Sequence, residues 1–174
     1  MRDDFARRDF VNTDLRGWDF TGAQLQGANF RGANLCGVPL READARGTIF
    51  DLANLAEADL SGALLQGARV RQAQLRRTSF RQALLLSAHL EGALVNETDF
   101  TGADLEWAWL TGVDFRQAIV CCALLLNVRG LTAEQQQIVE TGGGFTGRRP
   151  MILGRELYET SSGDSPAVES GARR

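Results

Sequence analysis

Few residues of this 174-residue chain could perform acid–base, nucleophilic or metal chemistry. His89 is its single histidine, and no second imidazole or thiol stands at ligand spacing from it. Cys36, Cys121 and Cys122 show no C-x-x-C spacing, so we expect reduced surface thiols. A histidine-based triad would need a serine beside His89, and none is clearly placed there. The sequence therefore predicts no enzymatic activity, no metal and no cofactor.

One glycine-rich motif has the spacing of a nucleotide-binding loop. Residues 142–147, GGGFTG, fit the pattern G-x-G-x-x-G. In dinucleotide-binding proteins that loop follows a strand and opens a helix within a βαβ unit. Here the motif follows a predicted helix instead, so we expect no nucleotide site.

Composition and charge exclude several classes of protein. The chain has 22 acidic and 19 basic residues, a net charge of −3, which argues against binding nucleic acid through bulk positive charge. It contains no apolar run near the roughly 18 residues that span a bilayer. It starts with the charged segment 1–4, MRDD, which does not resemble a signal peptide. We therefore expect a cytoplasmic protein that binds neither membranes nor nucleic acid directly.

The element that must position every side chain is a repeat of five residues. From Phe5 to Leu125 each fifth residue is apolar, mainly Leu or Phe, over 25 successive units. Ala prevails two residues before each centre, Asp or Asn one residue before it, and Gly two residues after it. A period of five fits neither an α-helix nor a strand, but it fits a chain that turns a corner every five residues. Gly at the second corner place can adopt the positive φ of a type II turn.

The pattern A-(D/N)-(L/F)-X-X, as in residues 28–32 (ANFRG) and 33–37 (ANLCG), resembles the pentapeptide-repeat family. The resemblance covers about residues 1–125. It implies an all-β fold, a right-handed quadrilateral β-helix with four pentapeptides per coil. Twenty-five units would then give about six coils, a tower about 30 Å tall at ~4.8 Å per coil.

The register ends after Leu125, and the remaining chain divides into three parts. We expect the β-helix to cover residues 1–128 and a short capping α-helix to cover residues 129–141, with Thr132 as N-cap and Gln135 completing a capping box. Residues 142–158 are predicted to pack on the β-helix as an extended segment. Residues 159–174 are polar and predicted to be disordered.

Several apolar side chains fall at positions that should point outward. They form a candidate partner surface on the C-terminal half: Leu64, Leu84, Leu86, Trp107, Trp109, Leu124 and Leu126. A contiguous exposed apolar patch indicates a binding surface or a surface that the chain itself covers. Residues 151–153, Met-Ile-Leu, could provide that cover, and the sequence leaves both alternatives open.

A second outward feature is basic. No acidic residue occurs between Asp59 and Glu91, while five arginines form a belt: Arg69, Arg71, Arg76, Arg77 and Arg81. The belt is either solvated and offset by acids in neighbouring coils, or it binds a phosphate group or an acidic partner.

The N-terminal end is the third candidate surface. Repeats begin within the first five residues, so no cap precedes them. Trp18 replaces the usual Ala and should distort or widen the first coil. An open end exposes apolar side chains and unpaired backbone groups, which predicts a homodimer through an end layer: Phe5, Phe10, Leu15, Trp18 and Phe20.

Two functions compete. The first is a non-enzymatic scaffold that presents rigid faces to a protein partner. The second comes from the resemblance: some members of the family mimic DNA, bind DNA gyrase or topoisomerase IV, and protect against quinolones or topoisomerase toxins. A mimic should carry outward rows of acids. Here residues 1–125 contain 16 acids and 13 arginines, and the arginine belt interrupts any such row, so the scaffold is favoured.

Overall fold

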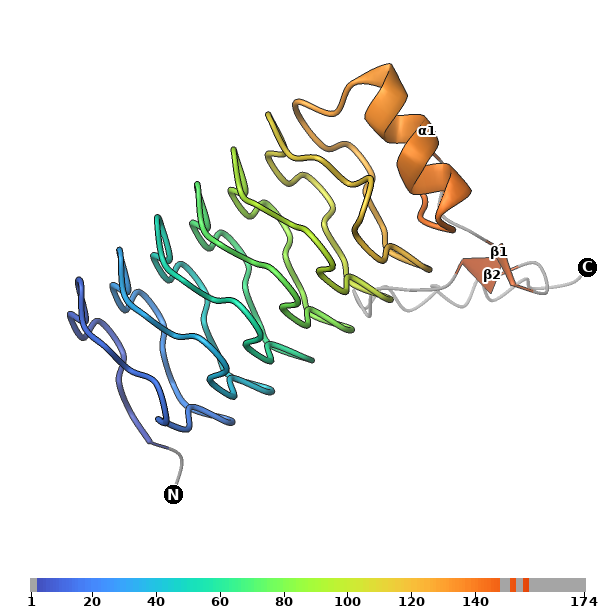
Figure 1. Cartoon of the computed structure of the whole chain (residues 1–174). Helices are drawn as coiled ribbons and strands as arrows, with labels where there is room; N and C mark the ends of the chain where they lie inside the picture. The colour runs from blue at the N-terminus through green and yellow to red at the C-terminus, as the bar shows by residue number, and fades with distance from the viewer. Residues whose placement is uncertain (1–2, 148–150, 153–154, 157–174) are drawn as a thin grey trace, which may run out of the picture.

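The structure is a computed structural model that describes residues 3–147, 151–152 and 155–156. The chain winds into successive coils that rise in sequence order from the N-terminus, and helix α1 lies at the far end (Figure 1). The regular elements outside the coils are α1 (Ala133–Thr141), β1 (Met151–Ile152) and β2 (Arg155–Glu156). No helix within the described ranges has the length and hydrophobicity that crossing a membrane requires.

The coils are joined by parallel bridges between residues twenty apart. Asp4 pairs with Gln24, Gln24 with Asp44, and Asp44 with Leu64. Phe5 N donates to Gln24 O at 2.8 Å, and Gln24 N donates to Asp3 O at 2.9 Å. Twenty residues comprise four pentapeptides, so each unit stacks on the unit four places later. Most units contribute one bridged residue rather than a longer strand, because the next corner follows at once.

The corners are type II turns. In the first unit Arg8 N donates to Phe5 O at 3.1 Å, and Arg7, between them, has a φ of 58°. The equivalent residue has a positive φ in every later unit up to Asn127 except Gln117. Many of these residues are not Gly; Trp107, for example, has a φ of 64°. The repeated ladder hydrogen bonds therefore impose the left-handed conformation even where a side chain makes it less favourable.

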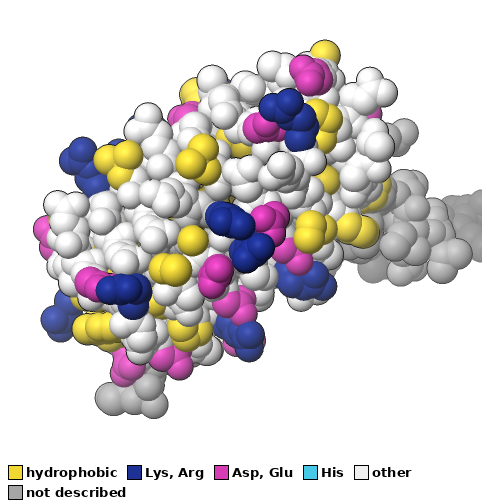
Figure 2. Space-filling model, in the orientation of Figure 1, with side chains coloured by type: hydrophobic (Ala, Val, Ile, Leu, Met, Phe, Trp, Pro, Cys, Tyr) yellow, Lys and Arg dark blue, Asp and Glu magenta, His cyan; other side chains and the backbone are white. Residues whose placement is uncertain are grey.

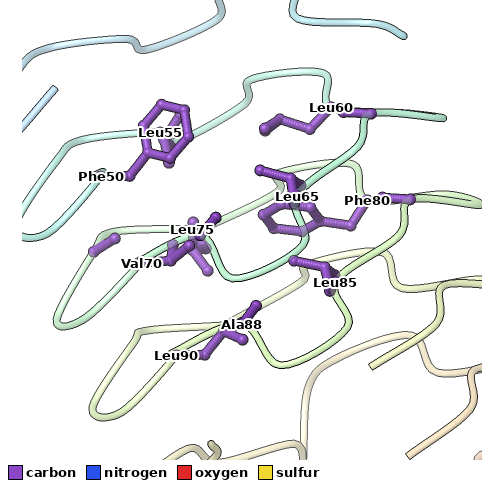
Figure 3. Packing of buried hydrophobic residues seen from close by; sticks show 14 of the residues in the cluster. Phe50, Leu55, Leu60, Leu65, Val70, Leu75, Phe80, Leu85, Ala88 and Leu90 are labelled. Atoms are coloured by element: carbon purple, nitrogen blue, oxygen red, sulfur yellow. The ribbon is translucent and has the colours of Figure 1, made fainter. Parts of the chain in front are cut away.

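The interior is filled by columns of stacked centres. Phe30 stacks on Phe10 with ring centroids 4.8 Å apart and on Phe50 at 5.1 Å. Figure 3 shows the continuation of this column through Val70 and Leu90, whose side chains point into the coil. Rings one coil apart lie nearly parallel because every coil repeats the same backbone. The Ala residues two before the centres are also buried, so side chains fill the axis of the described coils.

Three buried threonines replace Ala on the inward side. Thr48, Thr78 and Thr98 are fully buried. Their hydroxyl groups donate to backbone carbonyls twenty-three residues earlier, Thr48 to Leu25 O at 2.8 Å and Thr78 to Leu55 O at 2.7 Å. These bonds satisfy the only polar atom of each side chain, so Thr is accepted in the core.

The regular ladder is interrupted once in the last coil. Glu97 N donates to Gln117 O, twenty residues on, whereas the equivalent Arg77 N donates to Asn96 O, nineteen residues on. Gln117 is also the residue at the second corner place that lacks the positive φ of the other described corners. The side that contains Phe115 bulges there, and Leu94 beneath it is left exposed. The sequence register, which has no insertion, does not reveal this bulge.

Helix α1 closes the C-terminal end of the core. Its N-cap is Thr132, whose side chain accepts from Gln135 N at 3.2 Å. The Gln135 side chain does not return to Thr132 N as a capping box requires; its oxygen instead accepts from Phe115 N at 2.8 Å. Val139 is fully buried, and Leu131 and Ile138 pack against the core.

After the helix the chain returns to the last coil. Leu125 N donates to Phe145 O at 2.8 Å, and Phe145 N donates to Ala123 O at 2.9 Å. Strands β1 and β2 then pair antiparallel, Met151 with Glu156 and Ile152 with Arg155. The predicted packing of the whole segment 142–158 and the predicted disorder of residues 159–174 lie partly or wholly outside the described residues.

Candidate functional site

Trp107 is the largest apolar side chain exposed in the C-terminal half of the tower. It is 52% exposed at the second corner place of its turn. Gly27, Gly47 and Gly67 hold the same place in the second, third and fourth coils. A bulky residue at a corner that favours Gly gains no packing from its position, so its exposure needs another explanation.

The leucines predicted to surround Trp107 divide into two groups. Leu64, Leu84 and Leu86 are half-buried, and Leu64 pairs with Leu84 in the ladder. Leu124 and Leu126 are only 2% and 5% exposed, so these two outward positions are covered and do not belong to an exposed apolar patch. Phe145 forms a further rung above Leu124, because the chain folds back after α1. The side chains of residues 151–153, the predicted cover, lie outside the described part.

Trp109 is not available as a flat binding surface. Its indole stacks on the His89 ring, with centroids 5.5 Å apart and an interplanar angle of 16°. The Arg129 guanidinium lies over the ring, 4.4 Å from its centroid. Both faces of Trp109 are therefore occupied, and the column contributes cation–π and stacking energy to the last coils.

His89 belongs to a charged network rather than to a catalytic set. Its Nδ1 lies 3.1 Å from Arg71 Nη2 and 3.3 Å from Glu91 Oε1. Arginine can only donate, so Nδ1 accepts when it bonds Arg71. The described hydrogen bonds place no serine or cysteine against His89, and the described residues contain no cluster of three or more potential metal ligands.

Acids from neighbouring coils neutralise the arginine belt. Arg77 Nε donates to Glu97 at 2.7 Å and Arg81 Nη1 to Asp99 at 2.8 Å. Hydrogen bonding from Arg77 lowers the pKa of Glu97. The other belt arginines are paired as well: Arg69 with Asp51, Arg71 with Glu91, and Arg76 with Glu97. Each arginine of the belt is thus paired with at least one acid.

Many of these pairs share one geometry. The residue that follows the apolar centre of one unit contacts the residue that precedes the apolar centre of the unit stacked above it. These two residues are eighteen positions apart in the sequence. Arg41 bonds Asp59 in this way, and Ser61 lies 2.8 Å from Ser79. Figure 2 shows the result on one face, where Arg side chains lie beside Asp and Glu and apolar side chains are scattered. Such exposed pairs contribute about 0–1 kcal/mol each.

An open groove of about 640 Å³ lies on the face that carries the Phe30 column. Arg31, Arg69 and Arg71 line it together with Asp51 and Glu91. Asp51 is nearly buried and accepts both from Arg69 and from Arg71 N. Two of the three arginines are thus engaged by acids of the groove itself, which weakens the case for an anion site there.

The N-terminal end is covered by its own tryptophan. Trp18 stacks on Phe20 at 5.6 Å and meets Phe5 and Phe10 edge-on, both at 6.2 Å. Leu15 and Phe20 are fully buried, so they do not belong to an exposed end layer, contrary to the prediction. Phe5 and Phe10 are half-buried, and Trp18 is 44% exposed.

Trp18 leaves most of the ladder hydrogen bonds of the first coil in place. The ladder continues on both sides of it, from Leu15 N to Asn34 O and from Phe20 N to Pro39 O, both at 2.9 Å. No described coil lies beneath Trp18, so a large side chain fits where Ala is needed higher up. Among the described residues, however, Asp19 and Pro39 form no bridge of the kind that joins Asp4, Asp9 and Asp14 to the second coil, so the pairing is interrupted locally beside Trp18.

Comparison with known proteins agrees with the repeat. The sequence matches the family described as Pentapeptide repeats in eight copies, over residues 4–37, 37–72, 53–85 and 80–117. No curated protein matches.

Solved structures with similar folds include three repeat proteins. The plasmid-mediated fluoroquinolone resistance protein QnrB1 is 21% identical over 82% of this chain and 84% of its own, with a TM-score of 0.38. HetL, a heterocyst differentiation protein from Nostoc sp. strain PCC 7120, is 27% identical over 72% and 67%, with a TM-score of 0.27. AT2G44920 from the Arabidopsis thaliana thylakoid lumen is 31% identical over 60% and 69%, with a TM-score of 0.27.

The family match extends from residue 4 to residue 117 and so covers more than half of the chain, with the same five-residue period that builds the ladder. This chain therefore belongs to the pentapeptide-repeat family.

Proposed function

We propose that this protein is a non-enzymatic scaffold that binds a protein partner through Trp107 and its neighbours. The scaffold would be a right-handed, four-sided β-helix of about six coils. We define the Trp107 surface as Trp107 with Leu64, Leu84 and Leu86. The observation that carries the proposal is the exposed indole of Trp107 at a corner where the second, third and fourth coils have Gly.

The rigid support of Trp107 favours binding. Trp107 N donates to Leu126 O at 2.9 Å, and Ala108 N closes the turn on Leu105 O at 3.0 Å. A side chain on such a fixed backbone loses little conformational entropy when a partner covers it. Tryptophan is also among the residues that contribute most to the binding energy of protein interfaces.

The paired charges favour the scaffold over the DNA mimic. A mimic needs rows of acids whose charge is available to a DNA-binding enzyme. Here Asp59, Glu97 and Asp99 each hydrogen-bond an arginine of a neighbouring coil. Alternating pairs of opposite charge give little net field, which supports a partner recognised by shape and apolar contact.

Pairing of two copies through the N-terminal end stays a prediction. Trp18 reduces the apolar surface at that end to Phe5, Phe10 and the indole itself. The coil is also ringed by four aspartates, one on each side: Asp4, Asp9, Asp14 and Asp19. A second copy would bring like charges together, so the end supports dimerisation less than the sequence suggests.

Replacing Trp107 by Ser should abolish capture of the partner while leaving stability almost unchanged. Trp107 is exposed, and Ser at a positive φ is already tolerated one coil below, at Ser87. We expect partner affinity to fall by about 2 kcal/mol or more, as for interface tryptophans in general. The measurement is quantitative mass spectrometry of proteins captured from the source cell, with calorimetric binding to the best candidate.

Ile119→Ser provides the matched control. Ile119 is 50% exposed on a different side of the tower, so its loss removes a similar apolar area. Its captured proteins should match those of the unaltered chain. If Trp107→Ser and Ile119→Ser retain the same partners with the same affinities, the Trp107 surface is not the binding site.

A further inference from the structure

Two adjacent cysteines occupy the corner of the last regular turn. Cys121 and Cys122 stand between Val120 and Ala123, and Ala123 N donates to Val120 O at 3.0 Å. Both cysteines are exposed, and their sulfur atoms lie 3.5 Å apart. Cys122 has a φ of 60°, the positive value that the other corners share. The turn thus presents two thiols side by side to solvent.

The backbone of this pair is held from both sides. Gly102 N donates to Cys121 O at 2.9 Å from the coil below, and Cys122 N donates to Gly143 O at 2.8 Å in the segment that returns from α1. These bonds fix the direction of both Cα–Cβ bonds. The fold therefore holds the two Cβ atoms close together, and rotation about each Cα–Cβ bond brings the sulfurs to 3.5 Å.

We propose that Cys121 and Cys122 form a two-thiol site for a trivalent arsenical, in which one arsenic atom bridges the two sulfurs. An atom about 2.3 Å from each of two sulfurs, a usual length for a bond to thiolate sulfur, subtends an angle of about 100° when the sulfurs are 3.5 Å apart. That angle suits a pyramidal centre with three bonds and a lone pair. The arsenical brings its third substituent itself.

Other products fit the pair less well. A direct disulfide needs sulfurs about 2.05 Å apart and Cα atoms at least about 4.4 Å apart, whereas neighbouring Cα atoms are about 3.8 Å apart. A linear two-coordinate ion would need sulfurs about 4.6 Å apart at the same bond length. Zinc requires four ligands. The described residues offer no group of three or more histidine, cysteine or acidic ligands.

The reaction balances without any redox partner. In an arsenical with two hydroxyl groups, two As–O bonds break and two As–S bonds form. The two thiol protons leave on the departing oxygens as two molecules of water. Arsenic remains trivalent, and both sulfurs keep their oxidation state.

The thiols are close enough to influence each other's protonation. The hydrogen bond that Cys122 shares with Cys121, together with the charge on Cys121, raises the pKa of the Cys122 thiol. The Cys122 thiol thus holds its proton more firmly than an isolated thiol does.

The test uses the full-length reduced protein and phenylarsine oxide as the probe. One equivalent should add a single phenylarsenic group to the intact mass and reduce the titratable thiols from the three of Cys36, Cys121 and Cys122 to one. Because two bonds must break together, excess monothiol should fail to release the probe, whereas a small dithiol should release it.

Single substitutions separate chelation from ordinary thiol reactivity. C121S and C122S should each weaken retention against monothiol by about 100-fold or more, because the second attachment is lost. C36S should retain the probe like the unaltered chain, and circular dichroism should show all three variants folded. Equal retention by C122S and C36S, or release from the unaltered protein by monothiol, would overturn the proposal.

Discussion

A chain that lacks residues 41–60 should fold as cooperatively as the full chain, whereas a chain that lacks only Arg41 and Glu42 should lose its coils. The first deletion removes one complete coil of twenty residues, so residue 40 continues into residue 61 at the same place in the repeat. The second deletion removes the corner between Leu40 and Ala43, where Glu42 has a φ of 54°. Without that corner the chain cannot turn, and every later unit is displaced from its partner below.

The measurement is thermal and urea unfolding followed by far-ultraviolet circular dichroism. The chain with the twenty-residue deletion should retain a single sharp unfolding transition. Its folded tower should be shorter by about 4.8 Å, one strand spacing. The two-residue deletion should show no cooperative transition, or one that involves only part of the chain. A larger loss of structure from the longer deletion would show that the stacking period is not twenty residues.

Phe30→Ala should destabilise the protein by about 3–5 kcal/mol, the usual cost of removing a buried aromatic side chain. Phe30 is fully buried, lies between Phe10 and Phe50 in parallel stacks, and meets Phe20 edge-on at 5.7 Å. The coils above and below are held by their own ladders and cannot collapse into the space. The free energy of unfolding from urea denaturation measures the loss.

Leu94→Ala is the control for Phe30→Ala. Leu94 is exposed where the last coil bulges, so its replacement removes little buried area. We expect a change within about 0.5 kcal/mol. Comparable losses in the two variants would mean that the Phe30 column does not form the core.

The fold could be predicted from the sequence because one rule operates at every unit. Three positions determine which side chains point inward and which point outward, without long-range information. They are the apolar centre, the small residue two places before it and the corner residue two places after it. The hydrogen bond that closes each turn and the bridge to the next coil follow from the same period. The composition of the corners is less predictable, since residues such as Leu52 and Glu57 also adopt a positive φ at places where the repeat favours Gly.

The surfaces could be predicted less well, because they depend on side chains far apart in the sequence. Leu124 occupies an outward column, and only the return of the chain through Phe145 covers it. Nothing in the five-residue period indicates that return. The role of Trp18 also depends on more than the repeat. Its position predicts an inward side chain, but the indole covers the end of the core because no described coil lies beneath it.

The arginine pairs could have been found from the sequence. Arg41 and Asp59, like Arg81 and Asp99, are eighteen residues apart, the spacing that joins the end of one unit to the start of the unit above. A search for opposite charges at that spacing finds the partners of Arg69 and Arg81 in the belt, whereas Arg71, Arg76 and Arg77 pair with acids twenty or twenty-one residues later. The bulge at Gln117 has no such signal, since the period continues through it unchanged.

The stacking of units twenty residues apart is tested most directly by one distance across five coils. One spin label is attached to Thr21→Cys and the other to the native Cys121. Both positions are exposed, and they lie one hundred residues apart in the same outward column. Cys36→Ser and Cys122→Ser remove the other thiols. Pulsed electron paramagnetic resonance should give a narrow distribution centred near five strand spacings, about 24 Å. A broad distribution, or a centre well away from five spacings, would contradict the twenty-residue coil.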